Sequence, residues 1–193
     1  MTILVLSGSR NPQGKTAQAI DSIRKGIAAA SGESECLFLP ELNLERCRQC
    51  DSDGWGLCRK EGRCTVEDDF PTLVTKIKGS DVVVFANPVY FGDLTESMRG
   101  FLDRLRRILF LRNNPAIPPG IPAVGLCYAG GSGNGAPNCC ASLDRVLQIC
   151  RFDVVDMIPL RHQNLEVKLP ALEIVGKWLV TKPMSGQRFM APR

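Results

Sequence analysis

The sequence has little of what several common protein classes depend on. It contains a single histidine, His162, which follows the last of the expected strands; no serine–histidine or cysteine–histidine triad can be argued from it, and we expect this residue at the surface. Aromatic residues make up only 6 %, and the net charge of +4 is spread along the chain without a long basic block. A nucleic-acid partner is therefore not expected, and the charged stretch Arg104–Arg107 is interpreted as a solvated helix face.

Long apolar runs are also missing. None reaches the roughly 18–20 residues that a membrane span needs, so no membrane partner is expected. The first ten residues have neither a basic start nor a small-residue cleavage site, which argues against a signal peptide and favours a cytoplasmic protein. Disulfides rarely persist in that compartment, so the nine cysteines call for another explanation.

The chain does contain a regular alternation of strand-like and helix-like segments. Five short apolar runs are typical of buried parallel strands: Ile3–Ser7, Glu35–Leu39, Asp81–Ala86, Ala123–Tyr128 and Val154–Leu160. Helical spacing occurs in Thr16–Ala30 and around Phe70–Ile77, Met98–Leu105, Leu143–Cys150 and Leu172–Leu179. This order predicts an α/β fold, a three-layer sandwich around a five-stranded parallel sheet of strand order 2-1-3-4-5.

The length of 193 residues favours a single domain over residues 1–193. It includes a cysteine-rich insertion at about 45–66 and ends in a loose tail at 182–193. In such sheets, ligands bind beyond the carboxyl ends of the strands, near the switch point in strand order. The loops that follow residues 7, 87 and 129 are therefore the candidate binding loops.

The first of these loops has the composition of an anion site. It offers hydroxyl, amide, basic and glycine residues at the start of a helix, where backbone N–H groups and the helix dipole favour a phosphate: Ser9, Arg10, Asn11, Gly14, Lys15 and Thr16. A P-loop for a nucleoside triphosphate fits less well, because five residues instead of four separate Gly8 from Gly14. A plain strand-to-helix turn without a ligand is the other alternative.

The second loop places two adjacent aromatic residues, Tyr90 and Phe91, at the end of the third strand. A planar and partly apolar ligand explains them, with the backbone of Val89–Gly92 available to its polar edge. The alternative is that both rings pack beneath the loop.

The segment ANPVYFGDLTESMRGFLDR, residues 86–104, resembles the flavin loop and following helix of NAD(P)H-dependent FMN reductases and iron–sulfur flavoproteins. Gly8–Ser9 and Gly14–Thr16 are similar to the opening loop of the same families, and the resemblance covers roughly residues 1–150. It implies a flavodoxin-like fold with non-covalently bound FMN, the first loop on its phosphate. Its ring would lie on Pro88, Val89, Tyr90, Phe91 and Gly92, with Gly130 and Gly131 on the other side.

The resemblance further implies NAD(P)H as hydride donor, a small-molecule acceptor, a homodimer or homotetramer, and no catalytic side chain, since the flavin supplies the chemistry. An iron–sulfur flavoprotein that moves electrons between a protein partner, a [4Fe–4S] cluster and FMN is the alternative function. A phosphate-binding or regulatory domain without redox activity is a third.

Four cysteines decide between these alternatives. Cys47, Cys50, Cys58 and Cys64 read C-x2-C-x7-C-x5-C, and four thiolates in eighteen residues suit zinc or a [4Fe–4S] cluster. Related iron–sulfur flavoproteins have two residues between the second and third cysteines, where this chain has seven, so thiols without a metal are the third interpretation. The remaining cysteines (Cys36, Cys127, Cys139, Cys140 and Cys150) are expected to pack in the core.

Overall fold

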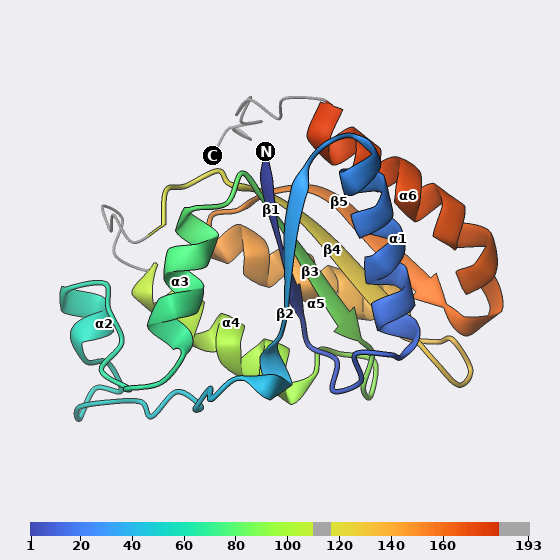
Figure 1. The fold of residues 1–193 in the computed structure, drawn as a ribbon. Helices are drawn as coiled ribbons and strands as arrows, with labels where there is room; N and C mark the ends of the chain where they lie inside the picture. Colours follow the sequence, from blue (N-terminus) through green and yellow to red (C-terminus); the bar gives the residue numbers. More distant parts are fainter. Residues whose placement is uncertain (110–116, 182–193) are drawn as a thin grey trace, which may run out of the picture.

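The computed structural model describes residues 1–109 and 117–181, so the tail expected at 182–193 lies outside the described residues. A parallel five-stranded sheet forms the centre of the molecule (Figure 1). Its strands are β1 (Thr2–Ser7), β2 (Glu33–Phe38), β3 (Val82–Pro88), β4 (Pro122–Ala129) and β5 (Asp153–Arg161). Their order, β2-β1-β3-β4-β5, confirms the predicted topology.

Helices cover both faces of the sheet, as the apolar runs of the strands require. One face carries α1 (Lys15–Ala29) and α6 (Leu165–Thr181), and the other carries α3 (Phe70–Lys78), α4 (Glu96–Ile108) and α5 (Ala136–Ile149) (Figure 1). Along β1, Leu4 and Leu6 pack toward α4, whereas Ile3 and Val5 pack toward α1. None of the helices in the described ranges has the length and apolar character that crossing a bilayer demands.

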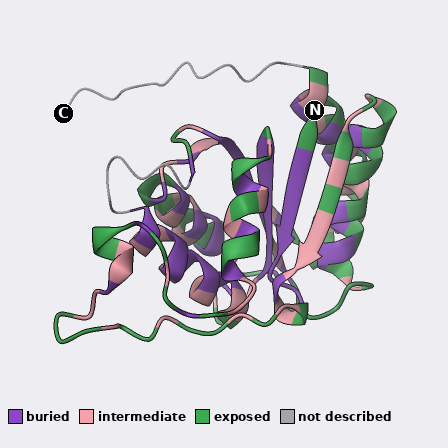
Figure 2. Cartoon of the chain, turned by 60° about the vertical axis from the view of Figure 1, so that its left-hand side comes forward, coloured by how far each residue is buried: buried purple, intermediate pink, exposed green. Residues whose placement is uncertain are grey.

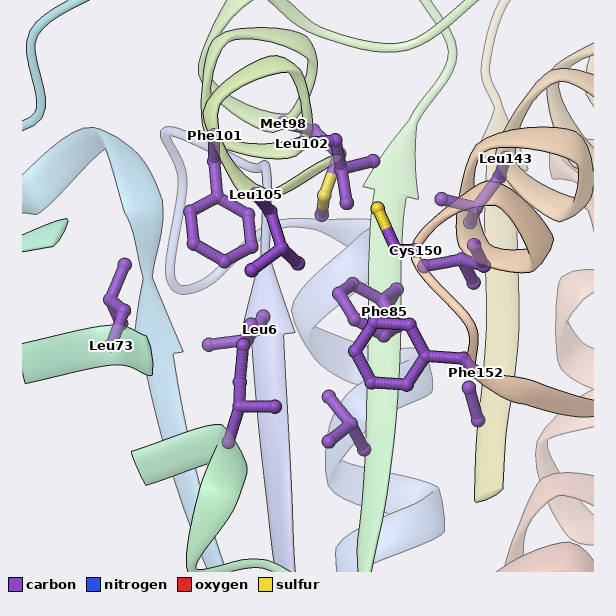
Figure 3. Close-up of a cluster of buried hydrophobic side chains, with 14 of the residues drawn as sticks. Leu6, Leu73, Phe85, Met98, Phe101, Leu102, Leu105, Leu143, Cys150 and Phe152 are labelled. Atoms are coloured by element: carbon purple, nitrogen blue, oxygen red, sulfur yellow. The ribbon is translucent and has the colours of Figure 1, made fainter. Parts of the chain in front are cut away.

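The centre of the sheet is fully buried and its edge is not (Figure 2). Every residue of β3 is buried, whereas the edge strand β2 has exposed and half-buried residues. Beneath α4 and α5, the Phe85 and Phe152 rings pack edge to face with centroids 5.2 Å apart (Figure 3). This packing holds the middle of β3, three residues before the strand ends and a candidate binding loop leaves it.

Two helices extend well before the apolar stripes that indicate them, which run from Leu143 and from Leu172. The α5 helix starts at Ala136 and the α6 helix starts at Leu165. Each contains a proline near its start, Pro137 in the first turn of α5 and Pro170 in the second turn of α6. Proline is tolerated in a first turn because that N–H has no partner there.

Between β2 and α3 the chain forms few regular elements. A short 3-10 turn, η1 (Leu39–Glu41), is followed by the cysteine-rich segment, which contains only the one-turn helix α2 (Leu57–Lys60). A second 3-10 turn, η2 (His162–Asn164), joins β5 to α6. His162 is exposed there, as expected.

Candidate functional site

Three loops meet at the carboxyl edge of the sheet: the first loop (residues 8–14), the second loop (89–95) and the third loop (130–135). The Gly8 N–H donates to the Ala86 carbonyl oxygen at 2.9 Å, and the Val89 N–H donates to that of Tyr128 at 2.8 Å. These bonds extend the pairing of the strands one residue beyond the ends of β1 and β3. The loops after the three central strands therefore form one continuous rim.

The first loop leaves the start of α1 open to an anion. Within the described residues no side chain caps this helix, and its first turn has no acidic residue. The Ser9 and Thr16 side chains are buried beside it, while Lys15 is exposed and Arg10 lies 3.5 Å from Glu96 at the surface. Uncapped N–H groups, two hydroxyls and two cations make a phosphate-sized anion the natural ligand.

The remaining predicted residues of this loop shape it. The Asn11 side-chain oxygen accepts from the Gln13 N–H at 2.9 Å, and the Gly14 N–H donates to the Asn11 carbonyl oxygen at 3.1 Å. The Asn11 N–H in turn donates to the Ser9 hydroxyl oxygen at 3.2 Å. These bonds hold the turn that leads into α1.

The second loop is a tight turn with an aromatic tip. Tyr90 and Asp93 exchange backbone hydrogen bonds of 3.1 and 3.0 Å across Phe91 and Gly92, whose φ angles are +51° and +77°. Positive φ at both central residues is the signature of a type I′ turn. The Phe91 ring is fully exposed and Tyr90 is half exposed, so Phe91 does not pack beneath the loop. A strained, exposed aromatic residue at a binding edge suits a flat ligand.

Asn87 is the buried polar residue that holds this loop in place. Its side-chain oxygen accepts from the N–H and the hydroxyl of Thr95, at 3.2 and 3.0 Å, and its NH₂ group donates to the Pro88 carbonyl oxygen. The same NH₂ group lies 3.5 Å from the Cys139 sulfur. Asn87 thus joins the second loop to the starts of α4 and α5. No motif in the sequence indicates this role.

A salt bridge supports the second loop from outside. Arg99 places one nitrogen 2.8 Å from both oxygens of Asp93, and the Leu94 N–H donates to the same carboxylate at 2.8 Å. Burial raises the pKa of Asp93, but the Leu94 N–H and the Arg99 charge outweigh it and hold the pKa below its usual value.

The third loop is built from glycines in the left-handed region. Gly131, Gly133 and Gly135 have φ angles of +48°, +74° and +85°, and the Gly133 N–H donates to the Gly130 carbonyl oxygen at 2.7 Å. Gly130 and Gly131 are exposed, so their backbone is accessible at the rim. The loop follows β4 as predicted and lies next to the turn of the second loop.

A groove of about 560 Å³ lies between the first loop, the second loop and the segment after β2. Its lining includes Gly8 and Arg10 of the first loop, Tyr90 and Thr95 of the second loop, and residues of the chain from Leu39 to Arg46. It has the size of a small-molecule site and mixes apolar with charged walls. Its far wall ends next to Cys47, so it lies between the binding loops and the cysteine-rich segment.

The four predicted metal-binding cysteines line one small cavity. Cys47, Cys50, Cys58 and Cys64 surround a space of about 20 Å³, which is enough for about one water molecule. Among the residues the structure describes, no three cysteine, histidine or acidic side chains are arranged to hold a metal ion. All four thiols nevertheless share one cavity, and thiols are the donors that zinc and iron–sulfur clusters take, so the chemistry of the donor set fits such a group.

Arg104 lines the same cavity, which contradicts the prediction that Arg104–Arg107 is a solvated face. Its side chain is only 2 % exposed and pairs with Asp68, whose side chain is fully buried. Burial raises the pKa of Asp68, but the hydrogen bond from Arg104 and those from the Glu45 and Phe70 N–H groups keep it below its usual value. Spacing along one helix could not reveal a partner 36 residues away.

The other cysteines are core residues, as expected. Cys127, Cys139, Cys140 and Cys150 are buried, Cys36 is half-buried, and all nine cysteines are free thiols. Burial raises the pKa of Cys36 to about 11 and that of Cys150 to about 12. Hydrogen bonding with Cys139 and Cys140, with burial in addition, raises the pKa of the Cys127 thiol. Cys36, Cys127 and Cys150 are therefore protonated at neutral pH.

A parallel sheet of order 2-1-3-4-5, with its candidate loops at the switch point, defines a flavodoxin-like α/β protein. The chain belongs to the NADPH-dependent FMN reductase family, whose model matches residues 1–165.

Relatives of known name are consistent with this family. An iron–sulfur flavoprotein of Methanocaldococcus jannaschii is 33 % identical over 134 residues, which is 68 % of this chain and 65 % of the relative. One from Archaeoglobus fulgidus is 28 % identical over 136 residues, or 67 % of this chain and 64 % of that protein. The matched region thus spans less than two thirds of the length of these relatives.

Solved structures share the fold. An NAD(P)H:quinone oxidoreductase from Methanothermobacter marburgensis has a TM-score of 0.68 at 16 % identity, covering 93 % of this chain and 96 % of that one. RosB with a bound riboflavin-5′-phosphate derivative has a TM-score of 0.70 at 19 % identity, covering 95 % and 77 %.

Proposed function

We propose that this chain binds FMN non-covalently and acts as an oxidoreductase that takes a hydride from NAD(P)H and passes electrons to a small-molecule acceptor. One observation carries the proposal: the uncapped start of α1 and the exposed turn at Tyr90–Asp93 lie on the same rim of the sheet. An anion position next to a ring platform matches a flavin with a terminal phosphate. Membership of the FMN reductase family supports it.

The first loop would hold the phosphate. Ser9 and Thr16 would donate from their hydroxyls, and the backbone N–H groups at the start of α1 would donate alongside them. Lys15 and Arg10 would add positive charge from the surface, while Asn11 and Gly14 keep the turn in shape.

The second and third loops would hold the ring. Pro88 to Gly92 would present backbone groups and the Tyr90 and Phe91 rings, and Gly130 and Gly131 would lie against the other side. FMN itself supplies the hydride chemistry when bound. The side chains therefore need only orient the ring and keep one face open to the nicotinamide, so we assign no acid or base.

A second candidate function is electron transfer through FMN and a [4Fe–4S] cluster, reduced by a protein partner. It is favoured by the single cavity that Cys47, Cys50, Cys58 and Cys64 share, next to the wall of the groove. Two relatives named iron–sulfur flavoproteins support it. The four cysteines would hold the cluster, with Arg104 and Arg107 close to them.

The first test compares FMN with riboflavin, which lacks the phosphate, by quenching of flavin fluorescence. We expect FMN to bind at least tenfold more tightly, and Thr16→Val to lose about tenfold in FMN affinity, or about 1.4 kcal/mol, with riboflavin affinity unchanged. Thr72→Val, on the exposed surface of α3, is the control. Equal affinities for the two flavins would contradict the phosphate site, and binding of neither would contradict the proposal.

The second test separates the two candidate functions. Flavin-loaded protein is mixed anaerobically with NADH or NADPH, and bleaching of the flavin absorption band supports hydride transfer. Iron and acid-labile sulfide are measured on the same preparation, with about four iron atoms per chain expected for the cluster. Light scattering of the purified protein tests the predicted homodimer or homotetramer.

A further inference from the structure

Arg104 is the largest fully buried side chain in the described part of the molecule. Two of its nitrogens bind the Asp68 carboxylate, one of them also donates to the Glu45 carbonyl oxygen at 3.0 Å, and its guanidinium lies 4.2 Å from the centre of the Phe70 ring. A buried ion pair of this kind costs about as much in lost hydration as it returns in attraction, so stability alone does not explain it.

Arg104 also makes a contact at the cysteine cavity, in addition to those with Asp68, Glu45 and Phe70. The Nη2 of Arg104 donates to the Cys64 sulfur at 3.4 Å, and Arg104 lines the cavity shared by the four thiols. The Nε of Arg104 is buried and has no hydrogen-bond partner among the described residues. Leaving a buried donor unpaired costs about 1–3 kcal/mol. An acceptor within hydrogen-bond distance of the Nε would remove this cost.

The arrangement defines what kind of effect Arg104 exerts. Asp68 neutralises most of the charge of the pair, so the cavity faces a dipole whose positive end, the guanidinium, is at Cys64. Hydrogen bonds to the sulfurs and the net charge nearby are two of the main determinants of the reduction potential of an iron–sulfur cluster. A buried dipole acts at low dielectric, where its influence is least screened.

We propose that Arg104 is a positioning residue that sets the reduction potential of the cluster held by Cys47, Cys50, Cys58 and Cys64, by donating to the Cys64 sulfur and offsetting the charge of the reduced form. The inference rests on the second candidate function. Arg104 keeps its proton and forms no covalent bond; the change it favours is the uptake of one electron, supplied by dithionite in the experiment below.

The test is a midpoint-potential titration of anaerobically reconstituted protein, followed by electron paramagnetic resonance. Because Arg104→Gln alone would leave the Asp68 carboxylate buried and unpaired, the main variant is the double change Arg104→Gln with Asp68→Asn. We expect its equilibrium constant for one-electron reduction to fall at least tenfold, a shift of about 59 mV to more negative potential. Arg104→Lys, which keeps the charge but loses the planar fork, should shift less.

The control is Arg106→Gln, two residues along α4, whose side chain is 40 % exposed and pairs with Asp103 away from the cavity. Its potential should match that of the unchanged protein. A double variant that holds its full iron content and has an unchanged potential would overturn the role of Arg104 without contradicting the cluster. Lower iron content with no shift in potential would overturn this role in the same way. Unchanged protein without four iron atoms would overturn the second candidate function and this role with it.

Discussion

Gly135, at the start of α5, lies directly against Gly92 in the turn of the second loop: a Cβ on Gly135 would come within 2.8 Å of the Gly92 Cα. This approach is closer than real Cβ contacts, so the second and third loops can touch only while position 135 has no side chain. The ring platform proposed above depends on that contact, because it holds the turn and the glycine loop as one surface.

We therefore expect Gly135→Ala to weaken FMN binding at least tenfold and to destabilise the fold. Gly120→Ala is a matched control, because Gly120 has the same φ of +85° but no atom within 4 Å of its added Cβ. The free energy of unfolding, from urea titration of both variants, separates the two effects. Backbone strain lowers the free energy of unfolding of each variant by about 1–3 kcal/mol. The additional loss in Gly135→Ala then measures the effect of crowding Gly92. Equal losses would show that the loops do not depend on it.

Phe91 combines a strained backbone with a fully exposed ring. Phe91→Gly should relieve the left-handed strain and raise the stability of the flavin-free protein by about 0.5–1 kcal/mol or more, while weakening FMN binding. Phe91→Ala should weaken binding as much without this gain in stability. Urea unfolding and flavin titration measure the two quantities. If Phe91→Gly binds FMN as tightly as the unchanged protein does, the Phe91 ring does not contribute to the FMN site.

Asn87→Ala should be costly because it removes the acceptor of the buried Thr95 N–H. An unpaired buried donor costs about 1–3 kcal/mol, and the second loop loses its link to α4 and α5. Urea unfolding is expected to show this loss, and amide hydrogen exchange is expected to be faster in residues 88–95. Gln148→Ala, on the exposed side of α5, is the control and should change neither. Normal exchange in the loop would show that Asn87 does not hold it.

The Asp93 carboxylate makes stability depend on acid. Because its pKa is held below the usual 3.8, its contribution is fully present above that value and is lost as the pH falls below it. The side chain is 48 % exposed, so we expect less than about 1 kcal/mol. The difference in unfolding free energy between the unchanged protein and Asp93→Asn should shrink from pH 7 to pH 3. A difference that is constant across this range would contradict the assignment.

The fold could be predicted because the three central strands β1, β3 and β4 are buried on both faces. Runs such as Asp81–Ala86 remain apolar whatever surrounds them, and their alternation with helices leaves few possible topologies. The rim of the sheet followed from topology as well, since parallel strands bring their carboxyl ends to one edge. The bounds of β1 and α1 differ from the prediction by no more than one residue at either end.

The buried polar residues could not be predicted in the same way. Asn87 and Arg104 are buried because of partners on other elements, Thr95 and Asp68, and periodicity along one segment carries no information about these. For Arg104, the charged run on α4 pointed toward solvent. The positive φ of Phe91 is likewise a property of a turn closed by Tyr90 and Asp93, and an aromatic residue gives no hint of it.

The helix α4 serves the molecule as a rigid spacer. Thr95 caps its first turn at the binding loops, and Arg104 and Arg107 line the cysteine cavity further along the same helix. Arg104 is nine positions after Thr95, which at the rise of an α-helix is on the order of 14 Å. Adding or removing one residue between them would turn Arg104 by about 100° away from Cys64. The length of this helix is therefore as restricted as the identity of the residues at its two ends.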